Sequence, residues 1–161
     1  MVIQTLAPHL VETLRGSARE ILETMVSMTP TSVDAREETD STFHDEVIGL
    51  LGFTGTRSGT FVVRTSLRCA TQMATNMLMT TPAELEDFEE VSDAFGELVN
   101  MLGGSFKNEW VTAGNEMDLS IPTVIREGQV TVSAACGRGP RSGVRVRIDD
   151  DQVDLSLHFE G

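Results

Sequence analysis

The sequence has few positively charged residues, which limits the kinds of partner that it can bind. Among 161 residues, 25 are acidic and 12 are basic, which gives a formal net charge of -13. Nucleic-acid binding needs a basic face that neutralises phosphates, so the charge argues against a nucleic-acid partner. An acidic surface instead favours a protein partner that carries a cationic patch.

Cysteine and histidine are also scarce, and they form no recognisable metal or redox motif. Cys69 and Cys136 lack a close-spaced partner, so we expect two buried free thiols rather than a disulfide. His44, Asp45 and Glu46 are adjacent, but neighbours on an extended segment point to alternating faces. This favours a solvated strand entry over a metal site, and we expect the chain to bind no cofactor of its own.

Long apolar runs are missing from the start of the chain. Residues 1–18 include charged and polar side chains, so they match neither a signal peptide nor a membrane span. We therefore expect a cytoplasmic protein without a membrane partner. The length fits one domain, 1–161, and 40% hydrophobic residues are enough to fill a single core.

Hydrophobic periodicity predicts the elements of the first half. Helical spacing favours a long first helix from about residue 8 to Met25, and the polar segment 31–40 is expected to be an exposed connection. Two β-like runs, 46–53 and 58–64, flank a short turn and predict a hairpin.

Helical spacing returns in the middle of the chain, and short extended segments follow. A helix is predicted over 67–79, in which Met73, Met77 and Met79 are expected to fill the core rather than line a partner groove. A second long helix is predicted over about 83–110. The extended segments are 118–121, 129–136, 143–148 and 152–159, with turns at 137–142 and 149–151.

This order of elements predicts an α+β fold. Hairpin-connected strands imply a mostly antiparallel sheet, and two long helices and a shorter helix are expected to pack against it. The two halves of the chain follow a similar plan, which suggests an internal pseudo-repeat.

The second long helix has an apolar back and a polar front. Asp93, Glu97, Asn100 and Gly104 fall on one side of the helix, and large apolar residues crowd the opposite side. Such a front is commonly just the solvated side of an amphipathic helix. Asparagine is a poor helix former, however, so Asn100 in mid-helix indicates a specific role, and Gly96 and Gly104 remove bulk around it.

The spacing of these residues resembles that of the CheC/CheX/FliY phosphatases of bacterial chemotaxis. The family pattern is an aspartate or serine, a glutamate, an asparagine and a later proline. In this sequence it runs Asp93-x3-Glu97-x2-Asn100, and 21 residues separate Asn100 from Pro122. The first helix lacks a second such pair, so the resemblance implies one active site per chain, as in CheX.

The resemblance implies a phosphatase that hydrolyses the aspartyl phosphate of a CheY-like receiver domain. The receiver would bring its own Mg²⁺ and lysine. Asn100 would orient the attacking water, and Glu97 would form a salt bridge to the receiver's lysine. Asp93, Gly96 and Gly104 are candidates for partner contact, although solvation of Asp93 and helix packing at the glycines explain the same residue types.

Two other functions stay open at this point. The chain could be a non-catalytic module that binds a receiver or a flagellar-switch component, which the retention of Glu97 and Asn100 disfavours. It could also be a dimerisation domain in which a strand such as 152–159 pairs across a two-fold axis. Since CheX relatives dimerise through their sheets, the resemblance implies a homodimer alongside the enzyme.

Overall fold

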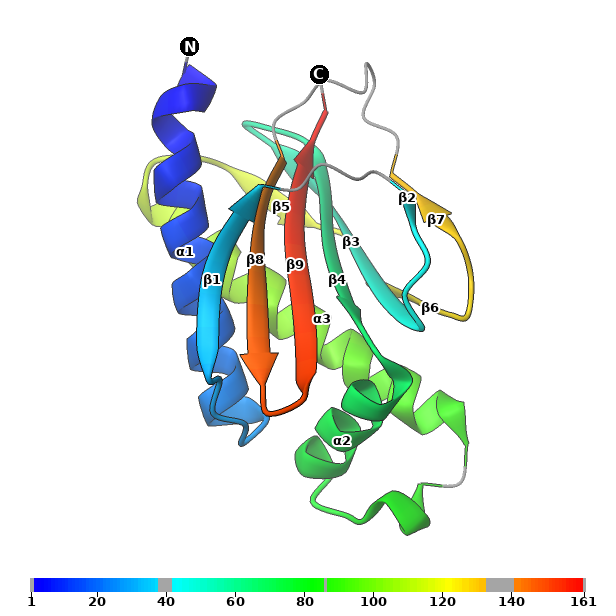
Figure 1. The fold of residues 1–161 in the computed structure, drawn as a ribbon. Helices are drawn as coiled ribbons and strands as arrows, with labels where there is room; N and C mark the ends of the chain where they lie inside the picture. Colours follow the sequence, from blue (N-terminus) through cyan, green and yellow to red (C-terminus); the bar gives the residue numbers. More distant parts are fainter. Residues whose placement is uncertain (1, 38–41, 86, 133–140, 161) are drawn as a thin grey trace.

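A seven-stranded sheet runs through the molecule, and two long helices lie against one face of it (Figure 1). The computed structural model describes residues 2–37, 42–85, 87–132 and 141–160. The helices are α1 (Val2–Met25), α2 (Leu67–Met77) and α3 (Phe88–Thr112), with a 3-10 turn, η1 (Pro82–Glu84). The strands are β1 (Ser32–Glu37), β2 (Thr42–Phe43), β3 (Val47–Gly55), β4 (Gly59–Thr65), β5 (Met117–Leu119), β6 (Thr123–Arg126), β7 (Val130–Thr131), β8 (Arg141–Ile148) and β9 (Asp151–Phe159).

The strands of the main sheet follow the order β1-β8-β9-β4-β3-β5, with β6 also beside β3. Every pairing is antiparallel, and β2 and β7 form a separate antiparallel pair. The α+β class with a mostly antiparallel sheet is thereby confirmed, whereas the pseudo-repeat stays a prediction. Within the described ranges, no helix has the length and apolar character needed to cross a membrane.

Apolar side chains fill the space between the sheet and the long helices. α1 contacts β1 and β8, and α3 contacts β3, β5 and β6, while α2 packs on α3 near one end of the sheet. Phe95, Leu98 and Leu102 from α3 are almost completely buried in this core. A second, smaller cluster lies on the opposite face of the sheet and consists of Phe43, Ile48, Val62 and Val130.

The predicted hairpin is confirmed as β3 and β4. Leu51 lies opposite Phe61 in the register, and both side chains are buried among the same core residues. Alternation places every second residue of these strands toward the helices. The β3 strand of the hairpin therefore provides the main surface on which α3 packs.

The segment predicted as an exposed connection, 31–40, is instead largely β1 as far as the structure describes it. Ser32–Glu37 pairs with β8 at one side of the sheet, and Val33 is its one buried large apolar side chain. Asp34 is exposed, so the strand meets water on one face and lacks the apolar content that marked the other strands. The prediction was wrong because a strand that is half exposed to solvent has a polar sequence similar to that of a loop.

Strand β9 lies in the interior of the sheet, which corrects the dimerisation hypothesis for 152–159. It pairs with β4 on one side and with β8 on the other, so its backbone groups have partners within the chain. A strand in this position has no free edge to pair with a second copy. The homodimer itself stays a prediction, which light scattering tests.

The second long helix begins later than predicted. η1 forms a separate turn in which the Thr80 hydroxyl and the Thr81 backbone N–H both donate to the carboxylate of Glu84. α3 then starts at Phe88, and the side chain of Asp87 caps it by accepting from the backbone N–H of Glu90 at 3.4 Å. The single helix predicted over about 83–110 thus corresponds to two elements, η1 and α3.

The methionines after β4 do not all fill the core. Met73 is buried and Met77 is half-buried, but Met79 is 93% exposed. α2 ends at Met77, and Met79 adopts a left-handed backbone conformation with φ of 55°. The prediction of core filler is therefore wrong for Met79, because the helix that would have buried it stops first.

Cys69 is a buried free thiol, as predicted. Burial raises its pKa, because removal from water disfavours the thiolate. Cys136 and the predicted turn over 137–142 lie wholly or mostly outside the described residues. The predicted turn at 149–151 is confirmed as the connection between β8 and β9, in which Asp149 has φ of 53°.

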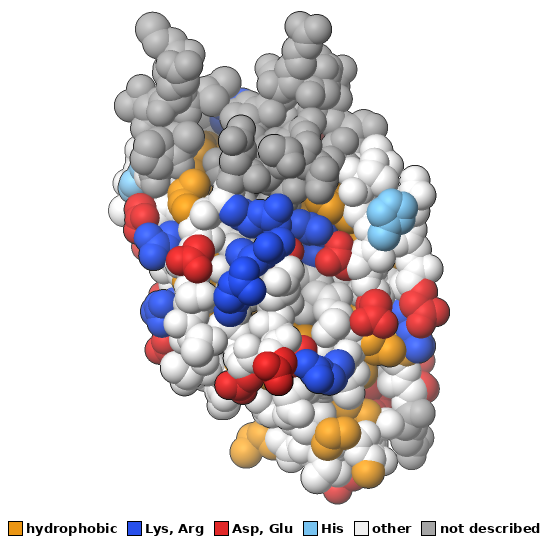
Figure 2. All heavy atoms as spheres, viewed as in Figure 1, with side chains coloured by type: hydrophobic (Ala, Val, Ile, Leu, Met, Phe, Trp, Pro, Cys, Tyr) orange, Lys and Arg blue, Asp and Glu red, His pale blue; other side chains and the backbone are white. Residues whose placement is uncertain are grey.

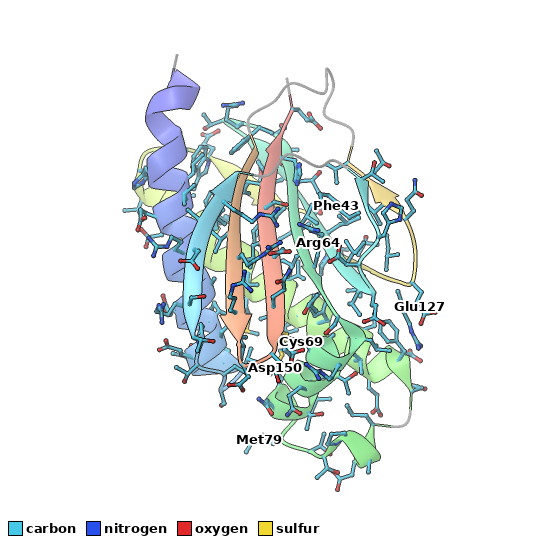
Figure 3. All side chains as sticks on the ribbon, viewed as in Figure 1. Phe43, Arg64, Cys69, Met79, Glu127 and Asp150 are labelled. Atoms are coloured by element: carbon cyan, nitrogen blue, oxygen red, sulfur yellow. The ribbon has the colours of Figure 1, made fainter. Side chains whose placement is uncertain are left out.

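Arginines gather on the sheet face that the long helices leave open (Figure 2). They surround Asp154 of β9, which is 3% exposed. Arg145 donates to both of its carboxylate oxygens, at 2.8 and 3.1 Å, and Arg36 and Arg64 lie at 3.5 and 3.7 Å. Arg64 also stacks on the ring of Phe43, 4.2 Å from its centroid (Figure 3).

Candidate functional site

Close packing on the sheet holds α3 in place beneath the candidate site. A methyl group added to Gly103 would collide with the Leu51 side chain, and one added to Gly49 would lie 2.5 Å from a methyl carbon of Val99. A side chain at either position would have to displace Leu51 or Val99, so glycine here lets the helix backbone lie close to β3. Gly103, inside the helix, thus serves packing between helix and sheet.

The polar front of α3 faces away from this packing. Asp93, Glu97 and Asn100 are all exposed. In the part of the chain that the structure describes, no hydrogen bond or ion pair within the protein engages any of these three side chains. Helical spacing places Glu97 and Asn100 as neighbours on the same side of the helix. The amide and the carboxylates are therefore available to a partner and do not hold the fold together.

Pro122, distant in sequence, reaches the same stretch of helix. Pairing of β5 and β6 with β3 brings the loop between them to α3, where Pro122 and Val124 lie 3.9 and 3.6 Å from the Cβ position of Gly96. The neighbouring Ile121 is 88% exposed. The structure thus brings Pro122 beside Gly96, the residue that precedes Glu97 in the chain.

The two glycines proposed for partner contact have different surroundings. Gly96 is buried and faces the loop before β6 and β6 itself, where an added Cβ would make only ordinary van der Waals contacts, so it is not on the open surface. Gly104 is half-buried, and a Cβ added there would meet nothing within 4 Å. Open space therefore lies above the helix one turn beyond Asn100, where a partner backbone has room to approach.

A groove of about 570 Å³ continues from the polar front toward α2 and η1. Apolar residues from both sides line it, namely Met77, Leu78, Leu85 and Ala94. Acidic residues also line it, namely Glu84, Glu90, Asp93 and Glu97. No local pattern in the sequence indicated this groove, because it forms between segments from α2, η1 and α3.

The carboxylate of Glu84 is held in its ionised form at this groove. Hydrogen bonds from the Thr80 hydroxyl, and then from the backbone of Thr81, lower its pKa. Among the described residues, no group of three or more histidine, cysteine, aspartate or glutamate side chains is placed to hold a metal ion. The chemistry of the site is thus that of an amide, fixed negative charges and apolar surface.

One known protein family matches more than half of the chain. The family described as chemotaxis phosphatase CheX matches residues 47–142, which span the hairpin, α2, α3 and the strands as far as the start of β8. The chain belongs to the CheX family. The match includes Asp93, Glu97, Asn100 and Pro122. No curated protein sequence matches the chain.

Solved structures of CheX proteins share the fold over nearly the whole chain. CheX from Vibrio vulnificus is 26% identical with a TM-score of 0.78, and the alignment covers 94% of this chain and 99% of that one. CheX from Desulfovibrio desulfuricans is 18% identical with a TM-score of 0.83, covering 94% and 99%. A chain in the solved CheX-CheY-BeF3-Mg²⁺ complex from Borrelia burgdorferi is 15% identical to this chain with a TM-score of 0.75. The alignment covers 94% of this chain and 98% of that one.

Proposed function

We propose that this chain is a phosphatase that hydrolyses the aspartyl phosphate of a CheY-like receiver domain. The observation that carries the proposal is the exposed pair Glu97 and Asn100, which has no side-chain partner within the described part of the chain. Membership of the CheX family supports it, as does the CheX-CheY complex of the Borrelia relative.

The reaction is a displacement at phosphorus. The oxygen of a water molecule bonds to phosphorus while the bond from phosphorus to the aspartyl oxygen breaks. The products are a free aspartate carboxylate and inorganic phosphate. The phosphate keeps the oxygen of the water, and a proton of the water passes to solvent. Such transfers are accelerated mainly by placing the nucleophile in line and by balancing charge.

Asn100 places the water in this scheme. Its amide has an oxygen that accepts a hydrogen bond and an NH₂ group that donates, but it is far too weak a base to remove a proton. The side chain stands free on the helix surface, so it can enter the receiver's active site without breaking a contact of its own. Its role is positioning the water.

Glu97 sets the helix over the phosphate. Its carboxylate pairs with the receiver's active-site lysine, which fixes the register of α3 against the receiver. Asp93 adds a further contact one turn away, and the open space above Gly104 admits the receiver backbone. Mg²⁺ belongs to the receiver and helps to balance the phosphoryl charge.

A screen of receivers tests the proposal. Receiver domains from the same organism are phosphorylated, and phosphate release is followed with and without this chain in the presence of Mg²⁺. We expect a faster release from at least one receiver, at substoichiometric amounts of the chain. If every receiver keeps its intrinsic rate, the chain is not a phosphatase of this kind.

Replacement of Glu97 should act mainly on binding. In the Glu97→Ala variant the salt bridge to the receiver is lost, and the receiver concentration for half-maximal rate should rise by about tenfold, since a buried charge-assisted contact is worth about 1.5–3 kcal/mol. Initial rates over a range of receiver concentrations measure this. Glu109→Ala, an exposed glutamate later in α3, is the matched control. A loss of turnover with unchanged affinity would contradict the salt-bridge role.

A further inference from the structure

The groove between α2, η1 and α3 has a composition that suits a particular kind of binding partner. Four apolar and four acidic side chains line it, and none of its described lining residues is a lysine or an arginine. A surface of this kind matches a segment in which apolar side chains stand beside lysine or arginine, because the apolar part is removed from water and the cation meets negative charge.

Next to the groove, large apolar side chains are exposed to water. Leu78 lines the groove and is 51% exposed, and the adjacent Met79 is 93% exposed. Figure 3 shows Met79 projecting from the loop after α2, away from the sheet, and Figure 2 shows hydrophobic side chains gathered at this end of the molecule. Adjacent exposed apolar residues beside a groove are a common mark of a protein-binding surface.

The backbone at Met79 indicates that its side chain is not there for the fold. The Leu78 N–H donates to Ala74, the Met79 N–H to Asn76 and the Thr80 N–H to Thr75, which closes α2 with Met79 in the left-handed region. Glycine is the usual residue at such a position, because a side chain there is strained. A methionine that is strained and also almost fully exposed gains nothing from the folded chain alone.

The far wall of the groove is pinned in position. Glu84 accepts hydrogen bonds from the Thr80 side chain and the Thr81 backbone, so the loop that carries Leu78 and Met79 is tied to η1. On the near side, Asp93 and Glu97 project from α3, whose back is packed on the sheet. The groove is thus present before any partner binds, which limits the entropy lost on binding.

We infer that this groove is the second half of the receiver-binding surface. A segment of the receiver that flanks its phosphorylation site, and that carries an apolar side chain next to lysine or arginine, occupies the groove and covers Leu78 and Met79. The inference rests on the proposed function, because the groove includes Glu97, one turn of helix from Asn100. The groove then governs which receiver is bound, while Asn100 governs the rate at which phosphate leaves.

The variant Met79→Gly separates binding from folding. It removes the apolar side chain and accepts the positive φ without strain, so the midpoint of thermal unfolding should hold or rise. Affinity is measured by calorimetry for the receiver found in the screen, loaded with Mg²⁺ and beryllofluoride. We expect binding about tenfold weaker, as for the loss of one well-placed interface side chain.

Three further variants complete the test. Leu78→Ala should weaken binding in the same way. Val111→Ala is the control and should leave binding unchanged, because Val111 is 47% exposed on α3 but lies about 21 Å from Glu97 along the helix axis. Asp93→Asn should reduce the salt dependence of the affinity, because it removes one charge from the rim.

The outcomes distinguish this inference from the proposed function. If the wild-type chain accelerates phosphate release and Met79→Gly and Leu78→Ala bind the receiver as tightly as the wild type, the groove is not the binding surface and the phosphatase stands. If the wild-type chain binds a receiver without accelerating release, the enzyme proposal is overturned, and the same affinities still decide for or against the groove. A chain that binds no receiver overturns both.

Discussion

Replacing Asn100 with alanine should lower stimulated phosphate release by about 100-fold or more, because misplacement of a reacting group by about 1 Å already costs that much. The receiver and its Mg²⁺ would still be present, but the attacking water would no longer be held in line. We therefore expect phosphate release to fall close to the receiver's intrinsic rate. The measurement is single-turnover release from a phosphorylated receiver at saturating Asn100→Ala protein.

Folding should survive this change. Asn100 is exposed, its side chain has no hydrogen bond within the described residues, and alanine is the better helix former. Asn108→Ala is a matched control, because Asn108 is an exposed asparagine two turns further along α3. Full activity in Asn100→Ala would exclude the assigned role, and an equal loss in Asn108→Ala would point to damage to the helix.

Replacing Asp154 with alanine should destabilise the fold by roughly 3 kcal/mol, because it removes a buried carboxylate that three partly buried guanidinium groups share, although Arg64 keeps its contact with Asp45 at 3.0 Å. Arg145 would lose its two-bond contact, and Arg36 and Arg64 would lose the carboxylate that separates them. Three positive charges would then face one another across neighbouring strands. Urea unfolding followed by circular dichroism measures the change in the free energy of unfolding.

Asp34→Ala serves as the control for Asp154. Asp34 lies opposite Arg145 in the register of β1 and β8, but it is exposed, so its removal should change stability by less than about 0.5 kcal/mol. Because α3 packs on the other face of the sheet, the Asp154 variant should keep its rate of phosphate release per folded molecule. Equal stability of the two variants would show that the arginine cluster does not depend on Asp154.

The elements that the sequence predicted correctly are those with a strong local pattern. Apolar alternation on either side of a short turn predicted β3 and β4, and helical spacing predicted α2 and most of α3. Val33 alone could not mark β1 as a strand, since its partner β8 lies more than 100 residues away. The interior position of β9 likewise depends on pairing with β4, which no local pattern encodes.

The candidate site divides in the same way. Asp93, Glu97 and Asn100 share a helix, so their common side followed from spacing alone. Pro122 reaches α3 only because β5 and β6 pair with β3, and the groove at Leu78 exists only because α2 ends and turns back toward α3. Features that join distant segments required the fold.

The two faces of α3 have separable consequences for how such proteins change over time. The buried face, with Gly103 against Leu51, determines shape, whereas the side chains of Asp93, Glu97 and Asn100 on the outer face make no hydrogen bond or ion pair with the described fold. Selection can therefore alter activity without altering architecture. On the proposed function, a single substitution at Asn100 would leave a chain that still binds the receiver through Glu97 but no longer speeds the loss of its phosphate.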